Sequence, residues 1–533
     1  MHSASQAAHD EDTAMSSESM RKRKIRGSTR HPNQIAAEYN VLDFGADPSG
    51  ATDSYAAFSA WSSAITAAGG GTGVVPAGTY VIDRYVSRDG SGAYLSLVRD
   101  FTFTRCNGLH LRGYGAVLNL KGNVSLTRDV DLGNGLYASY GKMLSPFIVW
   151  GCTNVCVEGF EINGHADQVS QQSNIVEPGG HCVSIWGSSG VTVRNMRIHH
   201  GWSDGISVRR NNGDPISGVG APIPHVASRQ VLIENCDVFA NARCNIAVHE
   251  ARHVRVSNCR VYCGGVTGGT ITYSPKAGID IEPDVQPPVT DVSNQFVVIE
   301  NCEVYGNGLR AIAANVRYSH VAIRGCFIDN ESEDQYPVVL SVPHCSIVDC
   351  EINVRTGHID AALTGTSPGS NVFTMERCLV RGTDSYGLLI AAQHGFISQA
   401  LVANNRFINE SQSPMSGRRF PSLSHGNDML MLTVRDNYIF IPRAAYGGIG
   451  QKVVVDMHAQ LVENNVYETD MSGGGNFFAV LYGPLGSGVG STRYSGRVRY
   501  ERFISPDGTG FRPGDNSNHD NRAPYADGSD GTR

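Results

Sequence analysis

Charged side chains are scarce in this 533-residue sequence, at 17% of all residues, where about a quarter is usual. Lys and Arg together number 43 and Asp and Glu 50, so the formal net charge is only −7. The lack of a basic excess excludes a non-specific nucleic-acid binder, and so weak an acidity excludes a strongly acidic disordered chain. Aromatic residues are also few, at 8%, whereas there are 61 glycines. This composition favours a β-rich chain with many tight turns.

Several motifs with known chemistry are missing as well. No run of about 18 apolar residues occurs, so we expect no transmembrane helix, and the first residues lack the apolar core of a secretory signal. We find no CxxC pair, no zinc-finger spacing, no phosphate loop, no dinucleotide fingerprint and no calcium loop. The sequence therefore predicts no metal or cofactor. The location stays open, with extracellular and virion-associated places as the two readings that we keep.

The 13 cysteines are an odd number, and many of them share one sequence context. A free cysteine behaves as a small hydrophobic side chain. We therefore predict reduced, buried and stacked cysteines in place of disulfides or metal ligands. The recurring positions are Cys236, Cys259, Cys302, Cys326, Cys350 and Cys378.

An internal repeat is the most informative feature of the sequence. Each unit has a segment of alternating apolar residues, a polar turn and a second short apolar segment, and this period of two predicts strands. The spacing from Asn195 to Ile206 is 11 residues, and it recurs from Asn235 to Ile246 and from Asn301 to Ile312. In the unit between the last two, the spacing from Asn258 to Ile279 is 21 residues, which implies an insertion of ten. A constant offset that tolerates insertions is typical of a β-solenoid, because each coil pairs only with its neighbours. The first segments are Val191–Asn195, Val231–Asn235, Val254–Asn258 and Val297–Asn301, and the second are Asp204–Val208, Cys244–Val248, Gly278–Ile281 and Arg310–Ala314.

Asparagines end the first segment of these units, at Asn195, Asn235, Asn258 and Asn301. Asparagine tolerates left-handed backbone angles, so we interpret this column as a structural corner and not as a site.

The repeat suggests four parts of the chain. Residues 1–38 and 505–533 are polar and low in complexity, and we expect two disordered tails. Residues 39–90 should hold the first strands and a capping helix that begins at Thr52-Asp53, buries Phe58, Trp61 and Ile65, and stops at Gly69–Gly71. Residues 91–504 would be the solenoid.

The segments Val41–Asp47 (VLDFGAD), Thr52-Asp53 and Val74–Tyr80 (VVPAGTY) resemble the N-terminal signature of the pectate-lyase-like superfamily. With the repeats, the resemblance covers roughly residues 40–480. It implies an all-β fold, a right-handed parallel β-helix. It also implies action on polysaccharides, since the superfamily includes polygalacturonase-like hydrolases, polysaccharide lyases, alginate epimerases and phage tailspike depolymerases. The Asn-Thr-Asp, Asp-Asp and Gly-His-Gly set of the polygalacturonases is missing, as is the Asp-Pro-His of the epimerases. Gly278–Pro283 (GIDIEP) resembles a motif of phage and bacterial β-helix proteins.

Stacking the coils in register turns the sequence into a surface map. If Ile206, Ile246, Ile279 and Ile312 face inward, residues one and three positions later face outward, because strand residues alternate. The near column then reads Ser207, Ala247, Asp280 and Ala313, with Ser184 before it. The far column reads Arg209, His249, Glu282 and Asn315, with Trp186 before it. Small neighbours beside Asp280 would leave room for a ligand, and insertions at 211–227, 263–277 and 283–295 would wall this patch.

Asp280 and Glu282 are the predicted catalytic pair. Two positions apart on one strand, their β-carbons are separated by about 6.5–7 Å, within the roughly 5–9.5 Å between the carboxyls of glycosidases. We assign Glu282 as the general acid and Asp280 as the base or nucleophile, and His249 as a residue that tunes Glu282 or acts itself. A structural ion, or pairing of the two acids with Arg209 and Lys276, is the alternative.

Candidate substrate-binding residues surround that pair. Arg209 suits a sugar carboxylate, Trp186 suits stacking on a sugar ring, and Asn315 lies in the same column. Asp204, Glu250 and Asp284 lie at strand ends beside the patch, where a turn residue or a solvated charge is the simpler interpretation.

Three functions follow from this interpretation. The first is a glycoside hydrolase acting on a complex, bacterial-type polysaccharide. The second is a polysaccharide lyase with His249 or a tyrosine as the base and Arg209 neutralising a uronate. The third is a non-catalytic glycan-binding or phage attachment protein. The expected partner is a polysaccharide, with neither nucleic acid nor membrane, and the resemblance to tailspikes implies a homotrimer.

Overall fold

The structure, a computed structural model, describes most of the chain between residues 37 and 504. The described ranges are 37–83, 101–120, 125–128, 130–139, 145–211, 226–282, 296–315, 320–329, 336–355, 358–363, 371–382, 387–392, 398–410, 422–426, 431–442, 452–456, 461–469, 477–481, 497–499 and 502–504. The two predicted tails lie outside these ranges, apart from residues 37 and 38.

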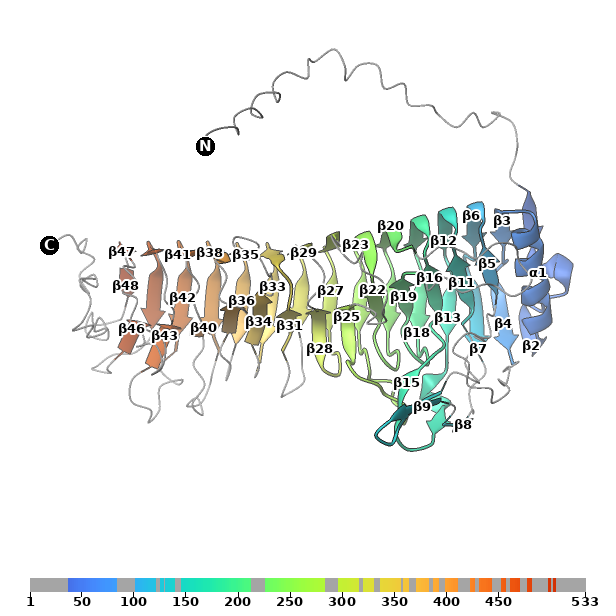
Figure 1. The fold of residues 1–533 in the computed structure, drawn as a ribbon, viewed down its shortest axis with the longest axis horizontal. Helices are drawn as coiled ribbons and strands as arrows, with labels where there is room; N and C mark the ends of the chain where they lie inside the picture. The colour runs from blue at the N-terminus through green and yellow to red at the C-terminus, as the bar shows by residue number, and fades with distance from the viewer. Residues whose placement is uncertain are drawn as a thin grey trace, which may run out of the picture. The chain divides into compact units, whose positions relative to one another are not determined.

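Three long parallel sheets make up the described part of the chain, and we call them sheets A, B and C (Figure 1). The chain visits A, B and C in turn and then begins the next coil, so neighbours within each sheet come from successive coils. This is the parallel β-helix that the repeat and the resemblance predicted.

Sheet A has 15 strands in the described residues. In order they are β1 Glu38–Asn40, β3 Gly71–Val74, β6 Asn107–Arg112, β12 Thr153–Glu158, β17 Ser189–Arg194, β20 Ser228–Glu234, β23 Ala251–Ser257, β26 Phe296–Glu300, β29 His320–Arg324, β32 His344–Val348, β35 Asn371–Glu376, β38 Ser398–Ala403, β41 Met431–Arg435, β44 Leu461–Glu463 and β47 Arg497–Arg499.

Sheet B also has 15 strands in these residues. They are β2 Ser49–Asp53, β4 Gly78–Ile82, β7 Ala116–Leu120, β13 Glu161–Asn163, β18 Arg197–His199, β21 Asp237–Phe239, β24 Arg260–Tyr262, β27 Glu303–Tyr305, β30 Phe327–Asp329, β33 Glu351–Val354, β36 Leu379–Gly382, β39 Arg406–Asn409, β42 Tyr438–Ile441, β45 Val466–Thr469 and β48 Arg502–Ile504.

Sheet C has 13 strands within the described ranges and carries the predicted site. They are β5 Thr102–Thr104, β11 Phe147–Trp150, β16 Val183–Trp186, β19 Ile206–Arg209, β22 Ile246–His249, β25 Ala277–Glu282, β28 Arg310–Ala314, β31 Val338–Leu340, β34 His358–Leu363, β37 Gly387–Ala392, β40 Ser422–Gly426, β43 Lys452–Asp456 and β46 Phe477–Leu481.

The core lies between the three sheets and is filled by alternate residues of each strand. On β19 the side chains of Ile206 and Val208 are fully buried in it, and the same holds for Ile246 and Val248 on β22. Because the described strands of the three sheets contribute their apolar positions to one shared interior from Val41 to Ile439, stacking the coils buries a continuous column of branched side chains.

Two side-chain columns mark the corner between sheets A and B. The predicted column has positive φ at Asn195, Asn235, Asn258 and Asn301, between 52° and 54°, which confirms its left-handed backbone. The next residue points inward and is a cysteine in six successive coils, from Cys236 to Cys378. All 13 cysteines are free, and those of the recurring context are buried, as predicted. Their thiols donate to main-chain carbonyl groups, as Cys302 does to Glu300 at 3.2 Å.

Helix α1 (Tyr55–Ala67) lies at the end of the stack that holds β3 and β5 (Figure 1). Phe58, Trp61 and Ile65 are fully buried, which confirms the predicted core face. The helix begins one residue later than predicted, with Ser54 as its N-cap, although the Asp53 carboxylate still accepts a hydrogen bond from the Tyr55 amide at 2.9 Å. Two short 3-10 turns, η2 (Val41–Phe44) and η3 (Ala166–Gln168), are the other helical segments of the described chain.

A small insertion lies beside the B–C corner. It contains β9 (Val130–Gly133), β10 (Leu136–Ser139) and β15 (Ile175–Pro178), and the pair β8 (Ser125–Leu126) and β14 (Ser170–Gln171). Trp202, Ala242, Ile271 and Tyr273 pack with this insertion in a second apolar cluster. No helix in the described ranges is long and apolar enough to cross a membrane.

Candidate functional site on sheet C

The register of sheet C is the one that the sequence map assumed. Ile206, Ile246, Ile279 and Ile312 are consecutive partners, so Ser207, Ala247, Asp280 and Ala313 form one column. Arg209, His249 and Glu282 form the other, with Trp186 before them. None of these outward residues belongs to the inner core cluster, whereas the isoleucines do. The structure therefore brings the predicted catalytic residues together on one face.

The near column is covered, which corrects the prediction that small neighbours leave room for a ligand beside Asp280. Asp280 is 1% exposed, and Ala247 and Ala313 are buried with it. Cys244, from the turn before β22, packs against Ala247 and Ala277, and its thiol lies 4.0 Å from the Asp280 carboxylate. A carboxyl group that faces outward can be buried when side chains from adjacent turns fold over it.

Arg243 and His249 organise the charges above Asp280. The Arg243 guanidinium donates to the carboxylates of Asp204 and Glu282, which come from different coils. The His249 ring lies between the same two carboxylates, with Nε2 at 3.9 Å from Asp204 and Nδ1 at 3.5 Å from Glu282. Glu282 is the carboxylate that solvent reaches, with 24% of its side chain exposed. The alternative from the sequence paired the two acids with Arg209 and Lys276, and the structure adds Arg243 as an ion-pair partner of Glu282.

The pKa values of the two buried carboxyl groups, Asp280 and Asp204, are shifted in opposite directions. Burial, together with the nearby charge of Glu282, raises the pKa of Asp280 to about 7. Burial also acts on Asp204, but the adjacent Arg243 and His181 outweigh it and hold the pKa of Asp204 well below its usual range. At neutral pH the site therefore contains one protonatable acid beside ionised groups, the arrangement that acid–base catalysis requires.

Asp204 is neither solvated nor a substrate contact, which corrects the sequence interpretation. It is fully buried and pairs with His181 at 3.1 Å and Arg243 at 3.3 Å, and it accepts the backbone N–H of Cys244 at 3.1 Å. Its role is to hold Arg243 and His181 in place.

Glu250 is corrected in the same way. It is buried and pairs with Arg210 at 2.7 Å, whose guanidinium is buried too. This ion pair joins the chain directly after Arg209 to the chain directly after His249, so it fixes the ends of β19 and β22.

Aromatic residues continue the outer face of sheet C toward the N-terminal coils. The Arg209 guanidinium lies over the Trp186 ring, 5.6 Å from its centroid. Trp186 in turn meets Trp150 edge to face, with ring centroids 5.3 Å apart. Trp150 is its partner in register on β11, a residue that the sequence map did not include.

Two of the predicted substrate-binding residues, Asn315 and Asp284, gain no binding role from the structure. Asn315 follows β28, where its backbone N–H donates to the Ile281 carbonyl at 2.8 Å. Asp284 lies outside the described residues, as do residues 212–225 and 283–295 of the predicted walls. The insertion 263–277 packs against the side insertion, where the Thr270 hydroxyl donates to the Val169 carbonyl at 3.0 Å.

Sequence reasoning missed Arg243, His181 and Cys244. Arg243 and Cys244 come from the turn before β22 and His181 lies two residues before β16, so the alternation of strand residues gave no signal for them. The one available signal was their position two or three residues before a strand of the repeat, where parallel coils bring the turns together.

The family described as the right-handed β-helix region matches residues 91–285 and 270–419, more than half of the chain. The chain belongs to this family. Among curated proteins it is 26% identical over 294 residues to the uncharacterized protein YclG of Bacillus subtilis. That match covers 55% of this chain and 45% of YclG, so the chain spans less than half the length of that relative.

Solved structures give weaker likenesses. One is the A-module of the mannuronan C-5 epimerase AlgE4 of Azotobacter vinelandii, with a TM-score of 0.38 and 16% identity, covering 75% of this chain and 95% of that one. Another is a tailspike protein of the E. coli bacteriophage HK620 in complex with a pentasaccharide, with a TM-score of 0.39 and 11% identity, covering 89% of this chain and 78% of that one.

Proposed function

We propose that the protein is a polysaccharide-degrading enzyme, a glycoside hydrolase whose active site is the outer face of β19, β22 and β25. The observation that carries the proposal is the convergence of Arg243, His249, Asp280 and Glu282, where the pKa of Asp280 is raised to about 7. Structural ion pairs can shift pKa values too, but a buried protonatable acid behind an accessible carboxylate is the pattern of a catalytic pair.

The proposed roles exchange those assigned from the sequence. Asp280, with its raised pKa, is the general acid, which a substrate reaches only when the side chains that cover it move aside, and Glu282, the more exposed carboxylate, is the base or nucleophile. Arg243 orients Glu282, and the His249 ring also lies beside Glu282. A sugar chain would run along Trp186 and Arg209, where the indole offers an apolar face and the guanidinium a donor for hydroxyl or carboxylate oxygens.

The position of His249 supports a second candidate, a lyase. Its ring is held between two carboxylates on the outer face of the sheet, where 11% of the side chain is exposed, and an imidazole in such a place can abstract a proton from a uronate. Lyase products carry a new carbon–carbon double bond, whereas hydrolysis adds water, so the masses of the products separate the two reactions.

The experiment is a screen of defined polysaccharides with mass spectrometry of the products. We expect wild type to release oligosaccharides that have gained one water per cleaved bond. Asp280→Asn and Glu282→Gln should each lower the rate by at least about 10²-fold, the lower end of the contribution of a general acid or base.

The matched control is Asp360→Asn. Asp360 lies in the same outward column of sheet C, three strands beyond Asp280, and burial raises its pKa as well. This variant should keep the wild-type rate. Products with a new double bond would show that the enzyme is a lyase and not a hydrolase. Binding without cleavage in every case, unchanged in Asp280→Asn, would identify a glycan-binding protein.

A further inference from the structure

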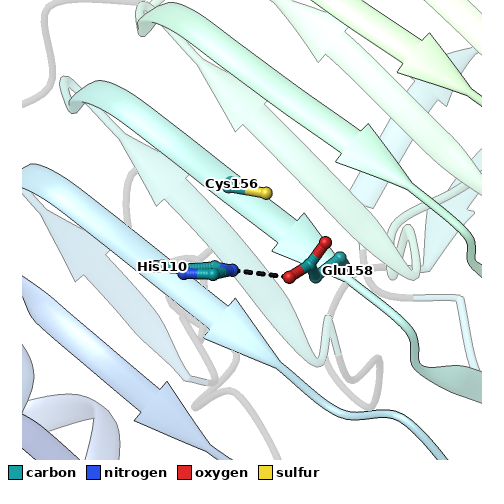
Figure 2. Close-up of side chains that lie close together, drawn as sticks. All are labelled: His110, Cys156 and Glu158. Carbon is teal, nitrogen blue, oxygen red and sulfur yellow. Dashed lines mark hydrogen bonds and ion pairs between the residues drawn. The ribbon is translucent and has the colours of Figure 1, made fainter.

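A second group of reactive side chains lies on the outer face of sheet A, on β6 and β12. It consists of His110, Cys156 and Glu158 (Figure 2). Each offers one ligand atom, and the three atoms all lie within 4.8 Å of one another. These residues come from coils before the candidate site and take no part in it.

The strand register holds the three residues together. Cys156 is the direct partner of His110 on the neighbouring strand, and Glu158 follows Cys156 by two positions, so all three share one face. Their strand neighbours Val155 and Val157 are buried in the core, which anchors this part of β12. The backbone positions are therefore fixed before any ligand binds.

Cys156 differs from the cysteines of the inner column. Of the 13 cysteines, 11 are buried, and only Cys156 and Cys263 are partly exposed. The packing that explains the other cysteines therefore does not explain Cys156, whose side chain lies beside the hydrogen-bonded pair of His110 and Glu158 (Figure 2).

The surroundings of Glu158 resemble the outer shell of a metal site. Its Oε2 accepts hydrogen bonds from Arg194 Nε at 2.7 Å and from the Tyr114 hydroxyl at 3.1 Å. Its Oε1 is directed at His110 Nε2, 2.7 Å away. Metal-ligating carboxylates are commonly oriented in this way through their second oxygen. Arg194 also brings a positive charge, which limits the affinity for a cation.

We propose that this cluster binds Zn²⁺ through His110 Nε2, Cys156 Sγ and Glu158 Oε1. Nitrogen, sulfur and oxygen donors together favour zinc over calcium or magnesium. Two ligand atoms of a tetrahedral zinc are roughly 3.3 Å apart, so rotation of the side chains suffices. On binding, the ion replaces the His110–Glu158 hydrogen bond, and the cysteine thiol releases its proton to solvent. His110 is 37% exposed, so a water molecule can take the fourth position.

The test uses the full chain, freed of metal with a chelator and titrated with Co²⁺ as a coloured substitute for zinc. We expect one equivalent of Co²⁺ to produce a thiolate-to-cobalt charge-transfer absorption, which Zn²⁺ then displaces. Cys156→Ser should abolish this absorption. His110→Ala should weaken binding by more than the roughly 10–100-fold that the loss of an outer-shell partner causes.

Cys263→Ser is the matched control, because Cys263 is the other partly exposed cysteine. It should bind Co²⁺ as wild type does. Both tested positions lie at the surface, and the thermal midpoint of each metal-free variant shows whether it folds. Absence of the absorption in wild type, or its persistence in Cys156→Ser, would overturn the proposal. The optical readout does not depend on catalysis, so its result tests the zinc site separately from the proposed hydrolase activity.

Discussion

At the scale of single residues, the site shows that burial alone does not decide the charge of a carboxyl group. Asp204 and Asp280 are both buried, yet Asp204 has the Arg243 guanidinium and the His181 ring in direct contact. The favourable interaction with Arg243 and His181 exceeds the cost of removing the Asp204 carboxylate from water, so the pKa of Asp204 is lowered. For Asp280 the cost of burial is the larger effect, so its pKa is raised.

The raised pKa of Asp280 makes stability depend on pH. An unfolded aspartate titrates near ~3.9, whereas the pKa of Asp280 in the folded chain is about 7. Between these values the folded state binds more protons than the unfolded state, so this residue lowers the free energy of unfolding as the pH rises through the window. Asp280→Asn should therefore gain stability relative to wild type from pH 4 to pH 7, in thermal unfolding followed by circular dichroism.

Asp349→Asn should change the pH dependence of stability in the opposite direction. Hydrogen bonds from Arg377 lower the pKa of Asp349, so its contribution is present above the unfolded value and disappears as the pH falls. This variant should lose stability at neutral pH and little at low pH. An Asp280→Asn midpoint that stays parallel to wild type across the window would contradict the assigned proton.

Arg243 should be important for stability as well as for the site. Arg243→Ala would leave Asp204 buried without its arginine, and breaking a buried ion pair in this way costs about 3–5 kcal/mol. The comparison is Arg381→Ala, which breaks a pair of which both side chains are well exposed, and such pairs contribute at most about 1 kcal/mol. Equal denaturation midpoints for the two variants in guanidinium chloride would show that Arg243 is not needed to compensate Asp204.

At the scale of elements, the corner between sheets A and B uses two chemistries at one position. Six cysteines occupy the inward place in earlier coils, and Asn405, Asn437 and Asn465 occupy it in later ones. The asparagine amides bond from coil to coil, as Asn437 Nδ2 does to Asn465 Oδ1 at 2.9 Å, while the thiols donate to carbonyl groups.

Asn437 should therefore tolerate cysteine better than alanine. Asn437 donates to Val402 and Asn465 and accepts two bonds from Asn405, all within the buried corner. Alanine would leave these groups without partners at about 1–3 kcal/mol for each. Asn437→Cys should keep the corner packed and lower the thermal midpoint less. Equal midpoints for the two variants would mean that the amide ladder adds nothing beyond filling space.

At the scale of the whole molecule, stability comes from coils that contact only their neighbours. The candidate site needs residues from the coils of β16, β19, β22 and β25, and one chain supplies all of them. The residues of the proposed site that the structure describes therefore all come from one copy of the chain.

The homotrimer implied by the tailspike resemblance stays a prediction. Sedimentation equilibrium should give three times the chain mass of 57.2 kDa. A monomer mass at micromolar concentration would contradict the trimer and leave the site on sheet C unaffected.

The sequence by itself determined the coil, the phase of its strands and the face on which Asp280, Glu282 and His249 meet. It could do so because a period of two and a constant offset of 11 residues from Asn195 to Ile206 fix which residues share a side. The column of corner asparagines followed for the same local reason, since φ above zero favours that residue type.

Only the tertiary structure decided what those residues are in contact with. Arg243 and His181 reach the site from the segments that precede β22 and β16, and the burial of Asp204, Glu250 and Asp280 depends on side chains that fold over them from other coils. Proton affinity depends on this burial and on the distances between charges. It therefore could not be predicted from the sequence pattern, and the acid and base that we propose are the reverse of those that the sequence predicted.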